Sequence, residues 1–251
     1  MILKKNIIIL SNFADKYSLD GIKIILRSKY FNLKSIVVTK KSKKFKFNFL
    51  KDVKVFYEGF PHKNLKIIKF IKNNDIKICI CLGFQNRIRS TFIKLFKEKI
   101  YNIHPAVLPF DKGSHSAFYT IMNNNLIGST LHIVNDKFDS GPIVDQIKEK
   151  NSLNFNAKVV HKKSRYLGLK LLKKNLGKIY FEKYKIKKNY KTKVNFKKEI
   201  VKASTLYHNK KYSGEYLWRL IRAVNFKKNG FYIKFKKKNF KIIPKIDFKY
   251  E

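Results

Sequence analysis

The chain contains 251 residues, of which 44% are apolar and only ten are glycine and five proline, so it is not a disordered, collagen-like or low-complexity protein. No stretch approaches 18 consecutive apolar residues, and no cleavage site follows the short apolar run at residues 7–10; we expect a soluble cytoplasmic protein with no membrane partner. The formal net charge is +42, but 52 of the 58 basic residues are lysines spread along the chain, whereas proteins that read nucleic acids favour clustered arginine.

Short apolar runs alternate with helical patterns over most of the chain. The runs predict strands at residues 7–10, 36–38, 53–57, 78–82, 100–104, 129–134 and 143–147. Apolar residues at helical spacing predict helices near residues 19–26, 65–71, 92–96, 116–124 and 157–176. Wholly apolar strands alternating with amphipathic helices are typical of a parallel sheet that is covered on both faces. We therefore expect a Rossmann-like α/β fold with a mostly parallel sheet.

The pattern changes near residue 178. Residues 178–212 are rich in lysine and aromatic residues and show no clean period. A helix predicted at residues 213–224 then precedes an apparent hairpin of residues 230–235 and 240–243. The sequence therefore predicts a main domain over residues 1–177 and a small α+β C-terminal subdomain over residues 178–251.

Three polar side chains follow predicted strands. Asn102 and His104 are two residues apart at the end of one strand, so both project from the same face, and Pro105 stops the strand there. Asp139 follows the next strand and precedes a Ser-Gly-Pro turn, which would place its carboxylate nearby. Because open α/β sheets bind ligands at the carboxyl ends of their strands, these residues form a candidate site.

An amide, an imidazole and a carboxylate suit acyl transfer to an amine without a covalent enzyme intermediate. The Asn102 amide and a protonated His104 would donate hydrogen bonds to the developing oxyanion. Asp139 would keep His104 cationic and accept the proton of the amine, directly or through water. Taken alone, an Asn-x-His pair at a strand end is more often a turn or a satisfied polar edge.

Residues 83–146 resemble the folate-dependent formyltransferase family, which includes glycinamide ribonucleotide, methionyl-tRNA and nucleotide-sugar formyltransferases. The resemblance rests on motifs in the order and spacing of that family: Asn102-Ile103-His104, Val107-Leu108-Pro109, Lys112-Gly113 and Asp139-Ser140-Gly141. It implies that Asn102, His104 and Asp139 are catalytic, that residues 1–177 are the catalytic domain, and that 10-formyltetrahydrofolate is the co-substrate. We expect no metal, because the histidines are scattered without matching cysteines or carboxylates.

The resemblance also implies a folate site. We assign to it the segment that resembles the family's pterin-lining stretch and two further residues: Phe84, Gln85, Asn86, Arg87, Ile88, Leu108 and Asp136. Phe84, Ile88 and Leu108 would supply apolar walls, although Phe84 and Ile88 would pack equally well in an ordinary core. His132 lies on the strand beside the catalytic residues. We interpret it as structural, with support of those residues as the alternative.

The C-terminal part bears on the acceptor amine. The helix at residues 213–224 and the Gly-aromatic start of the hairpin resemble the C-terminal subdomain of nucleotide-sugar N-formyltransferases, which favours a nucleotide-linked amino sugar as acceptor. Glycinamide ribonucleotide and methionyl-tRNA remain alternatives, with tRNA less favoured because only 105 residues follow Gln146. A homodimer is left open. We assign five residues to substrate binding: Ser11, Asn12, Lys112, His115 and Arg222.

A non-enzymatic function is also open, namely a basic RNA-binding protein on a degenerate formyltransferase fold. Residues 151–251 carry 30 basic and 5 acidic side chains and are the part that would meet a polyanion. The joint presence of Asn102, His104 and Asp139 argues against such degeneration. Lysine, asparagine, isoleucine, phenylalanine and tyrosine are also the residues that an A+T-rich coding sequence over-produces, which explains the charge without a polyanionic partner.

Overall fold

The computed structural model describes residues 2–12, 16–39, 50, 52–97, 99–225 and 230–244. The chain forms two compact units that are interleaved along the sequence. Unit 1 consists of Met1–His104, Thr130–Gln146 and Gly168–Tyr190, and unit 2 consists of Pro105–Ser129, Ile147–Leu167 and Lys191–Glu251. The domain division at residue 178 stays a prediction, and the helix at that position continues to Phe181.

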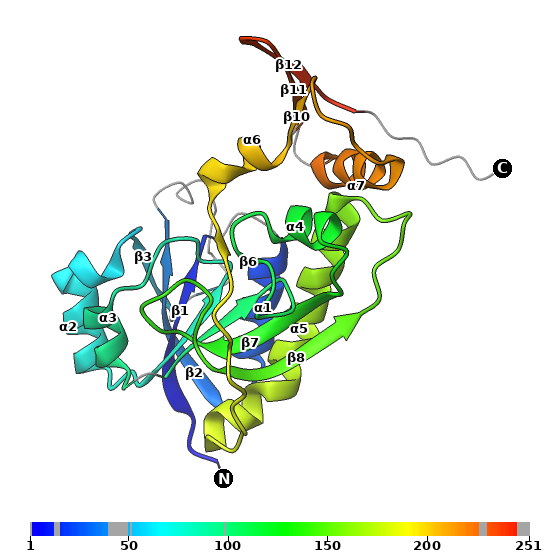
Figure 1. The fold of residues 1–251 in the computed structure, drawn as a ribbon. Helices are drawn as coiled ribbons and strands as arrows, with labels where there is room; N and C mark the ends of the chain where they lie inside the picture. Colours follow the sequence, from blue (N-terminus) through cyan, green and yellow to red (C-terminus); the bar gives the residue numbers. More distant parts are fainter. Residues whose placement is uncertain are drawn as a thin grey trace. The chain divides into compact units, whose positions relative to one another are not determined.

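A seven-stranded sheet has the strand order β3-β2-β1-β4-β5-β7-β8 (Figure 1). The strands are β1 (Lys5–Ser11), β2 (Phe31–Val38), β3 (Lys54–Tyr57), β4 (Ile78–Leu82), β5 (Ile100–His104), β7 (Ile127–Ile133) and β8 (Ile143–Glu149). From β3 to β5 every neighbouring pair is parallel, and β7 runs antiparallel to β5. The expected Rossmann-like, mostly parallel sheet is therefore confirmed.

Helices follow the strands as the apolar spacing predicts (Figure 1). They are α1 (Lys16–Leu26), the 3-10 turn η2 (Pro61–Lys63), α2 (Leu65–Asn73), α3 (Ser90–Leu95) and the long helix α5 (Ala157–Phe181). Asn64 starts α2, because its side chain accepts hydrogen bonds from the backbone N–H groups of Lys66 and Ile67. None of the described helices combines the length and apolar character that crossing a membrane requires.

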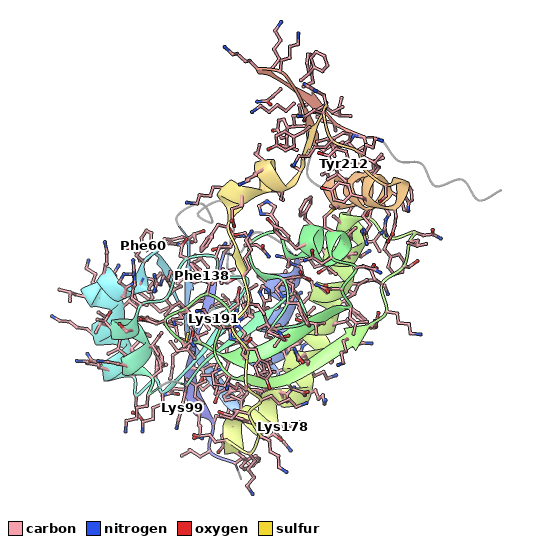
Figure 2. All side chains as sticks on the ribbon, in the orientation of Figure 1. Phe60, Lys99, Phe138, Lys178, Lys191 and Tyr212 are labelled. Atoms are coloured by element: carbon pink, nitrogen blue, oxygen red, sulfur yellow. The ribbon has the colours of Figure 1, made fainter. Side chains whose placement is uncertain are left out.

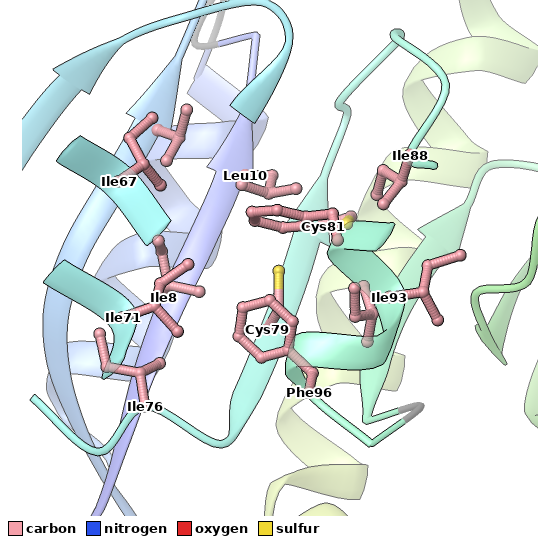
Figure 3. Close-up of a cluster of buried hydrophobic side chains, with 13 residues drawn as sticks. Ile8, Leu10, Ile67, Ile71, Ile76, Cys79, Cys81, Ile88, Ile93 and Phe96 are labelled. Atoms are coloured by element: carbon pink, nitrogen blue, oxygen red, sulfur yellow. The ribbon is translucent and has the colours of Figure 1, made fainter. Parts of the chain in front are cut away.

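One face of the sheet in unit 1 is covered by α2 and α3. Figure 3 shows the buried cluster between them and the strands, which includes Ile67 and Ile71 of α2 and Ile93 just after Phe92 in α3. Cys79 and Cys81 are two residues apart on β4 and therefore project into this same cluster, where both are free and buried. Burial of these side chains is the main free-energy source for this layer.

The opposite face of β4 carries α1. Gly21 of α1 lies so close to the strand that a Cβ atom there would be 2.7 Å from Cδ1 of Leu82, a separation that real Cβ atoms do not adopt. Leu82 follows Cys81 and therefore projects from the other side of the sheet. The two faces together bury every residue of β4, and this explains its uninterrupted apolar run.

Unit 2 holds α4 (Ser116–Met122), η3 (Lys197–Glu199), α6 (Ile200–Ala203) and α7 (Gly214–Val224). Its three-stranded sheet has the order β10-β11-β12, formed by Thr205–Tyr207, Phe231–Phe235 and Lys238–Ile242. A two-stranded sheet pairs β6 (Lys112–Gly113) with β9 (Val194–Asn195). The predicted helix and the antiparallel hairpin after it are both present, and Leu220, Ala223 and Val224 of α7 are buried against α4 residues such as Phe118.

Candidate active site

The pairing of β5 with β7 places four polar side chains on neighbouring strands. Asn102 lies opposite His132, and His104 lies opposite Thr130. Asn102 and His104 share a face of β5 because they are two residues apart, and His132 and Thr130 share a face of β7 for the same reason. This register is a property of the fold that neither strand shows alone.

Asp139 completes the cluster from the loop after β7. Asn102 Nδ2 lies 3.3 Å from Asp139 Oδ1 and 3.0 Å from His132 Nε2. His104 Nδ1 lies 3.4 Å from Asp139 Oδ2, and His132 Nε2 lies 3.5 Å from Asp139 Oδ1. The structure thus brings together Asn102, His104 and Asp139, the three residues singled out in the sequence, and adds His132.

The loop holds Asp139 in place through its backbone. Asp139 has a φ of 46°, in the left-handed region that aspartate tolerates better than most residues. The side-chain amide of Asn189 donates hydrogen bonds of 2.9 Å to the carbonyl oxygens of Asp139 and Gly141. At Gly141 a Cβ atom would lie 1.7 Å from the carbonyl oxygen of Ile133, so only glycine fits there.

The cluster is largely withdrawn from water. The side chain of Asp139 is 12% exposed, that of His104 6% and that of His132 2%. Charge interactions are stronger in such surroundings than in water, and the carboxylate lies between two imidazoles. The arrangement can therefore stabilise charge and exchange protons with a neighbouring reactant.

A pocket in unit 1 opens beside the cluster. Its open space, including solvent at the mouth, is about 410 Å³. Apolar walls come from Phe84, Ile88, Val134 and Phe138, the last of which is labelled in Figure 2. Polar and charged side chains complete the lining: Asn86, Arg87, Asn102, His132, Asn135, Asp136, Lys137 and Asp139.

Among the residues assigned to folate from the sequence, Phe84, Asn86, Arg87, Ile88 and Asp136 line this pocket. Two hydrogen bonds fix their loop: Asn86 Nδ2 donates to the carbonyl oxygen of Gly59 at 2.7 Å, and Arg87 Nε donates to that of Asp136 at 3.0 Å. Gln85 is exposed and is not among the lining residues.

Residues 33–151 match a family model described as formyl transferase. The matched segment, a little under half of the chain, is similar to the formyl transferase family. The expected resemblance is thereby confirmed, and the Asn-x-His pair lies inside the matched segment.

Curated relatives match the chain over different lengths. Methionyl-tRNA formyltransferase of Mycoplasma pneumoniae is 34% identical over 98 residues, which are 38% of this chain and 31% of the relative. The chain spans about a third of the length of the curated relatives first found.

Two solved structures show the same fold. A sugar N-formyltransferase from a Shewanella species has a TM-score of 0.77 at 17% identity, over 98% of this chain and 99% of that chain. An N-formyltransferase from Helicobacter canadensis, in complex with folinic acid and dTDP-3-aminofucose, has a TM-score of 0.67 at 20% identity, over 94% and 85%.

The predicted substrate residues fall in both units. In unit 1, Ser11 ends β1 and its hydroxyl donates to the carbonyl oxygen of Leu82 at 2.8 Å, with Asn12 next in the chain. In unit 2, Lys112 is buried in β6 and His115 precedes α4 with a φ of 59°. Their substrate roles stay predictions.

Two further assignments fall in unit 2. Leu108 is buried there, and its assignment to folate stays a prediction. Arg222 is also buried, and its Nη1 donates to the carbonyl oxygens of Ser152 at 2.7 Å and Phe155 at 3.1 Å. These contacts bind Nη1 within unit 2, whereas Nε is buried without a hydrogen-bond partner among the described residues, and the substrate role of Arg222 stays a prediction.

His132 was not included in the catalytic group predicted from the sequence. It was interpreted as structural, yet its ring lines the pocket and contacts both Asn102 and Asp139. The available signal was that His132 lies two residues after Thr130, so both project from the same face of one strand. This spacing does not show which strand pairs with theirs or in which register. Among the described residues, no group of three or more histidine, cysteine, aspartate or glutamate side chains is arranged to hold a metal ion.

Proposed function

We propose that the protein is an N-formyltransferase that moves the formyl group of 10-formyltetrahydrofolate to the amine of a nucleotide-linked amino sugar. The observation that carries this proposal is the convergence of Asn102, His104 and Asp139, each within 3.5 Å of another member, with Asn102 and Asp139 lining a pocket. An amide donor, an imidazole and a carboxylate are the groups that acyl transfer to an amine needs.

The pocket supports a flat heteroaromatic ligand. Phe84, Ile88 and Phe138 offer apolar walls, and Asn135 offers an amide at the edge. A pterin ring has apolar faces and hydrogen-bonding edges, so these residues suit it.

Bound 10-formyltetrahydrofolate would supply the electrophilic formyl carbon. His104 directs Nδ1 at the Asp139 carboxylate, and a proton on Nε2 would make that atom a donor for the oxygen that gains negative charge. The carboxylate of Asp139 is also the base that accepts the proton of the acceptor amine, directly or through one water. Asn102 supplies a further N–H donor from β5.

The amino-sugar acceptor is supported by the structural neighbours. The Shewanella sugar N-formyltransferase aligns over nearly the whole of both chains, so the likeness includes the small three-stranded sheet of unit 2. The Helicobacter structure holds a folate and a nucleotide-linked amino sugar together. A second acceptor, methionyl-tRNA, is favoured by the sequence match to the Mycoplasma enzyme.

A panel of acceptors tests the proposal. Formyl transfer from 10-formyltetrahydrofolate is measured with amino-sugar nucleotides, glycinamide ribonucleotide and methionyl-tRNA, and the largest kcat/KM is expected with an amino-sugar nucleotide. A preference for methionyl-tRNA or glycinamide ribonucleotide would overturn the acceptor. Tight, strongly salt-dependent RNA binding, with no transfer and no thermal stabilisation by folate, would overturn the enzyme itself.

A further inference from the structure

We propose that His132 is a positioning residue that fixes the orientation of the Asn102 amide and thereby aims one of its N–H groups into the pocket. The catalytic consequence rests on the proposed function, whereas the hydrogen-bond arrangement does not. Unlike His104, His132 is among the described residues that line the pocket, and it contacts two members of the predicted catalytic group.

The backbone decides the tautomer of His132. Its Nδ1 lies 3.0 Å from the carbonyl oxygen of Ile133. A carbonyl oxygen only accepts hydrogen bonds, so Nδ1 carries the hydrogen. In the neutral ring Nε2 then carries no hydrogen and can only accept a hydrogen bond. The atom that lies 3.0 Å from it is Nδ2 of Asn102, which donates.

The carboxylate of Asp139 decides the orientation of Asn102. Oδ1 of an ionised aspartate accepts only, so the Asn102 atom that lies 3.3 Å from it is the amide nitrogen and not the amide oxygen. Asp139 and a neutral His132 therefore both require the nitrogen of the Asn102 amide, and not its oxygen, to face them. Each of the two residues fixes the orientation of the amide.

The distances also show how the amide hydrogens are used. The contacts of 3.0, 3.3 and 3.5 Å among Asn102 Nδ2, His132 Nε2 and Asp139 Oδ1 form a triangle in which the two acceptors subtend only about 67° at Nδ2. The two N–H bonds of an amide diverge by about 120°. When one hydrogen is shared between His132 and Asp139, the second is left for the pocket, where it can donate to a developing oxyanion.

Protonation of His132 would undo this arrangement. The Nε2–H group and the Asn102 amide N–H would then be two donors facing each other. If the amide rotated to relieve this, its oxygen would face the negatively charged carboxylate of Asp139. Other titratable or charged groups around the ring are His104 beyond Asp139, Cys81 on β4, and Arg87, Asp136 and Lys137 in the pocket lining. The acid limb of the activity profile is therefore expected to depend on His132.

Two substitutions separate positioning from packing. His132→Gln keeps a carbonyl acceptor near Nε2 and removes the titration, so kcat should stay within about fivefold of wild type while the acid limb of kcat weakens. His132→Phe fills the space without an acceptor, so kcat should fall about 10- to 100-fold with the KM for folate nearly unchanged. His208→Gln, at an exposed histidine, is the matched control and should leave both values and the profile unchanged.

A spectroscopic test does not depend on the reaction. The NMR signals of His132 in ¹⁵N-histidine-labelled protein are those that disappear in the His132→Gln variant. Near neutral pH they should show a protonated Nδ1 and an unprotonated Nε2. Asn102→Ala should shift the Nε2 signal. An Nε2–H tautomer, or His132→Phe with the kcat and pH profile of the wild type, would overturn the proposal. If wild type transfers formyl to no acceptor, the proposed function fails while the tautomer result still decides the arrangement.

Discussion

Two aspartates, one in each unit, share the same unusual backbone and have different surroundings. Asp139 has a φ of 46° and Asp111 a φ of 51°. The Asp111 carboxylate accepts hydrogen bonds of 2.9 Å from Thr120 Oγ1, 3.1 Å from Asn123 Nδ2 and 3.0 Å from Asn125 Nδ2. The contacts of Asp139 with Asn102, His104 and His132 are longer, from 3.3 to 3.5 Å.

The partners explain the difference. Thr120, Asn123 and Asn125 are neutral donors within 14 residues of Asp111, at and after α4, so its carboxylate ties one helix end to one loop. The partners of Asp139 come from two strands, include two imidazoles and border a pocket. Short bonds to neutral donors suit a fixed structural charge, whereas longer contacts to titratable groups leave room for proton transfer. Residue type and backbone conformation alone would not have separated the two.

The largest expected effect is catalytic. Asp139→Asn keeps the size and removes the charge, so it should lower kcat at least about a hundredfold, because the base and the counter-charge of His104 are lost together. Formyl-transfer kinetics measure this, and circular dichroism and thermal unfolding check that the fold is intact. Retained activity would remove Asp139 from the catalytic group.

The same change at the other aspartate should do the opposite. Asp111→Asn turns an amide donor toward Thr120, Asn123 or Asn125, so at least one buried donor loses its partner. We expect the free energy of unfolding in urea to fall by about 2–4 kcal/mol, with kcat per folded molecule near wild type. A large loss of kcat without a loss of stability would contradict the contrast between the two sites.

A smaller effect is expected at Arg222. Replacing it with methionine keeps the buried stem and removes the Nη1 donor from the carbonyl oxygens of Ser152 and Phe155. Burial lowers the pKa of the guanidinium, and nearby Arg219 lowers it further, so part of the lost bonding is offset. We expect a stability loss of about 1–3 kcal/mol and an unchanged acceptor KM. An unchanged stability with a raised acceptor KM would support the predicted substrate role.

These cases show how far the sequence reaches. The mostly parallel sheet, covered on both faces, followed from uninterrupted apolar runs such as Ile78–Leu82, because only burial on both faces suits them. Asn102 and His104 followed from a separation of two at a strand end. The position of Asp139 depended on a family resemblance. The contacts of His132 and Arg222 could not be predicted because strand register and helix docking are tertiary properties, which local spacing does not encode.

The smallest expected effect is on stability and concerns a third aspartate, Asp145 on β8 in unit 1. Its partners are a lysine, a side-chain amide and a backbone N–H group. Lys174 Nζ lies 2.9 Å from Oδ2, Asn175 Nδ2 donates to Oδ2 at 3.0 Å, and the backbone N–H of Gln146 donates to Oδ1 at 2.8 Å. Burial raises the pKa of this carboxyl, but the hydrogen bonds from Asn175, Lys174 and Gln146 outweigh it, so the pKa lies below its ordinary value.

The sign of the pH dependence follows from that direction. A depressed carboxyl pKa adds stability above the unfolded value of about 3.9, and this stability is lost as the pH falls through the folded pKa. Asp145→Asn should therefore lower the free energy of unfolding at pH 7 by about 1 kcal/mol or less, and the gap to wild type should close below about pH 4. Thermal unfolding from pH 3 to 7 measures it. A gap that persists at pH 3 would mean that Asp145 acts through packing and not through its charge, as Asp111 is expected to act through bonding and Asp139 through proton transfer.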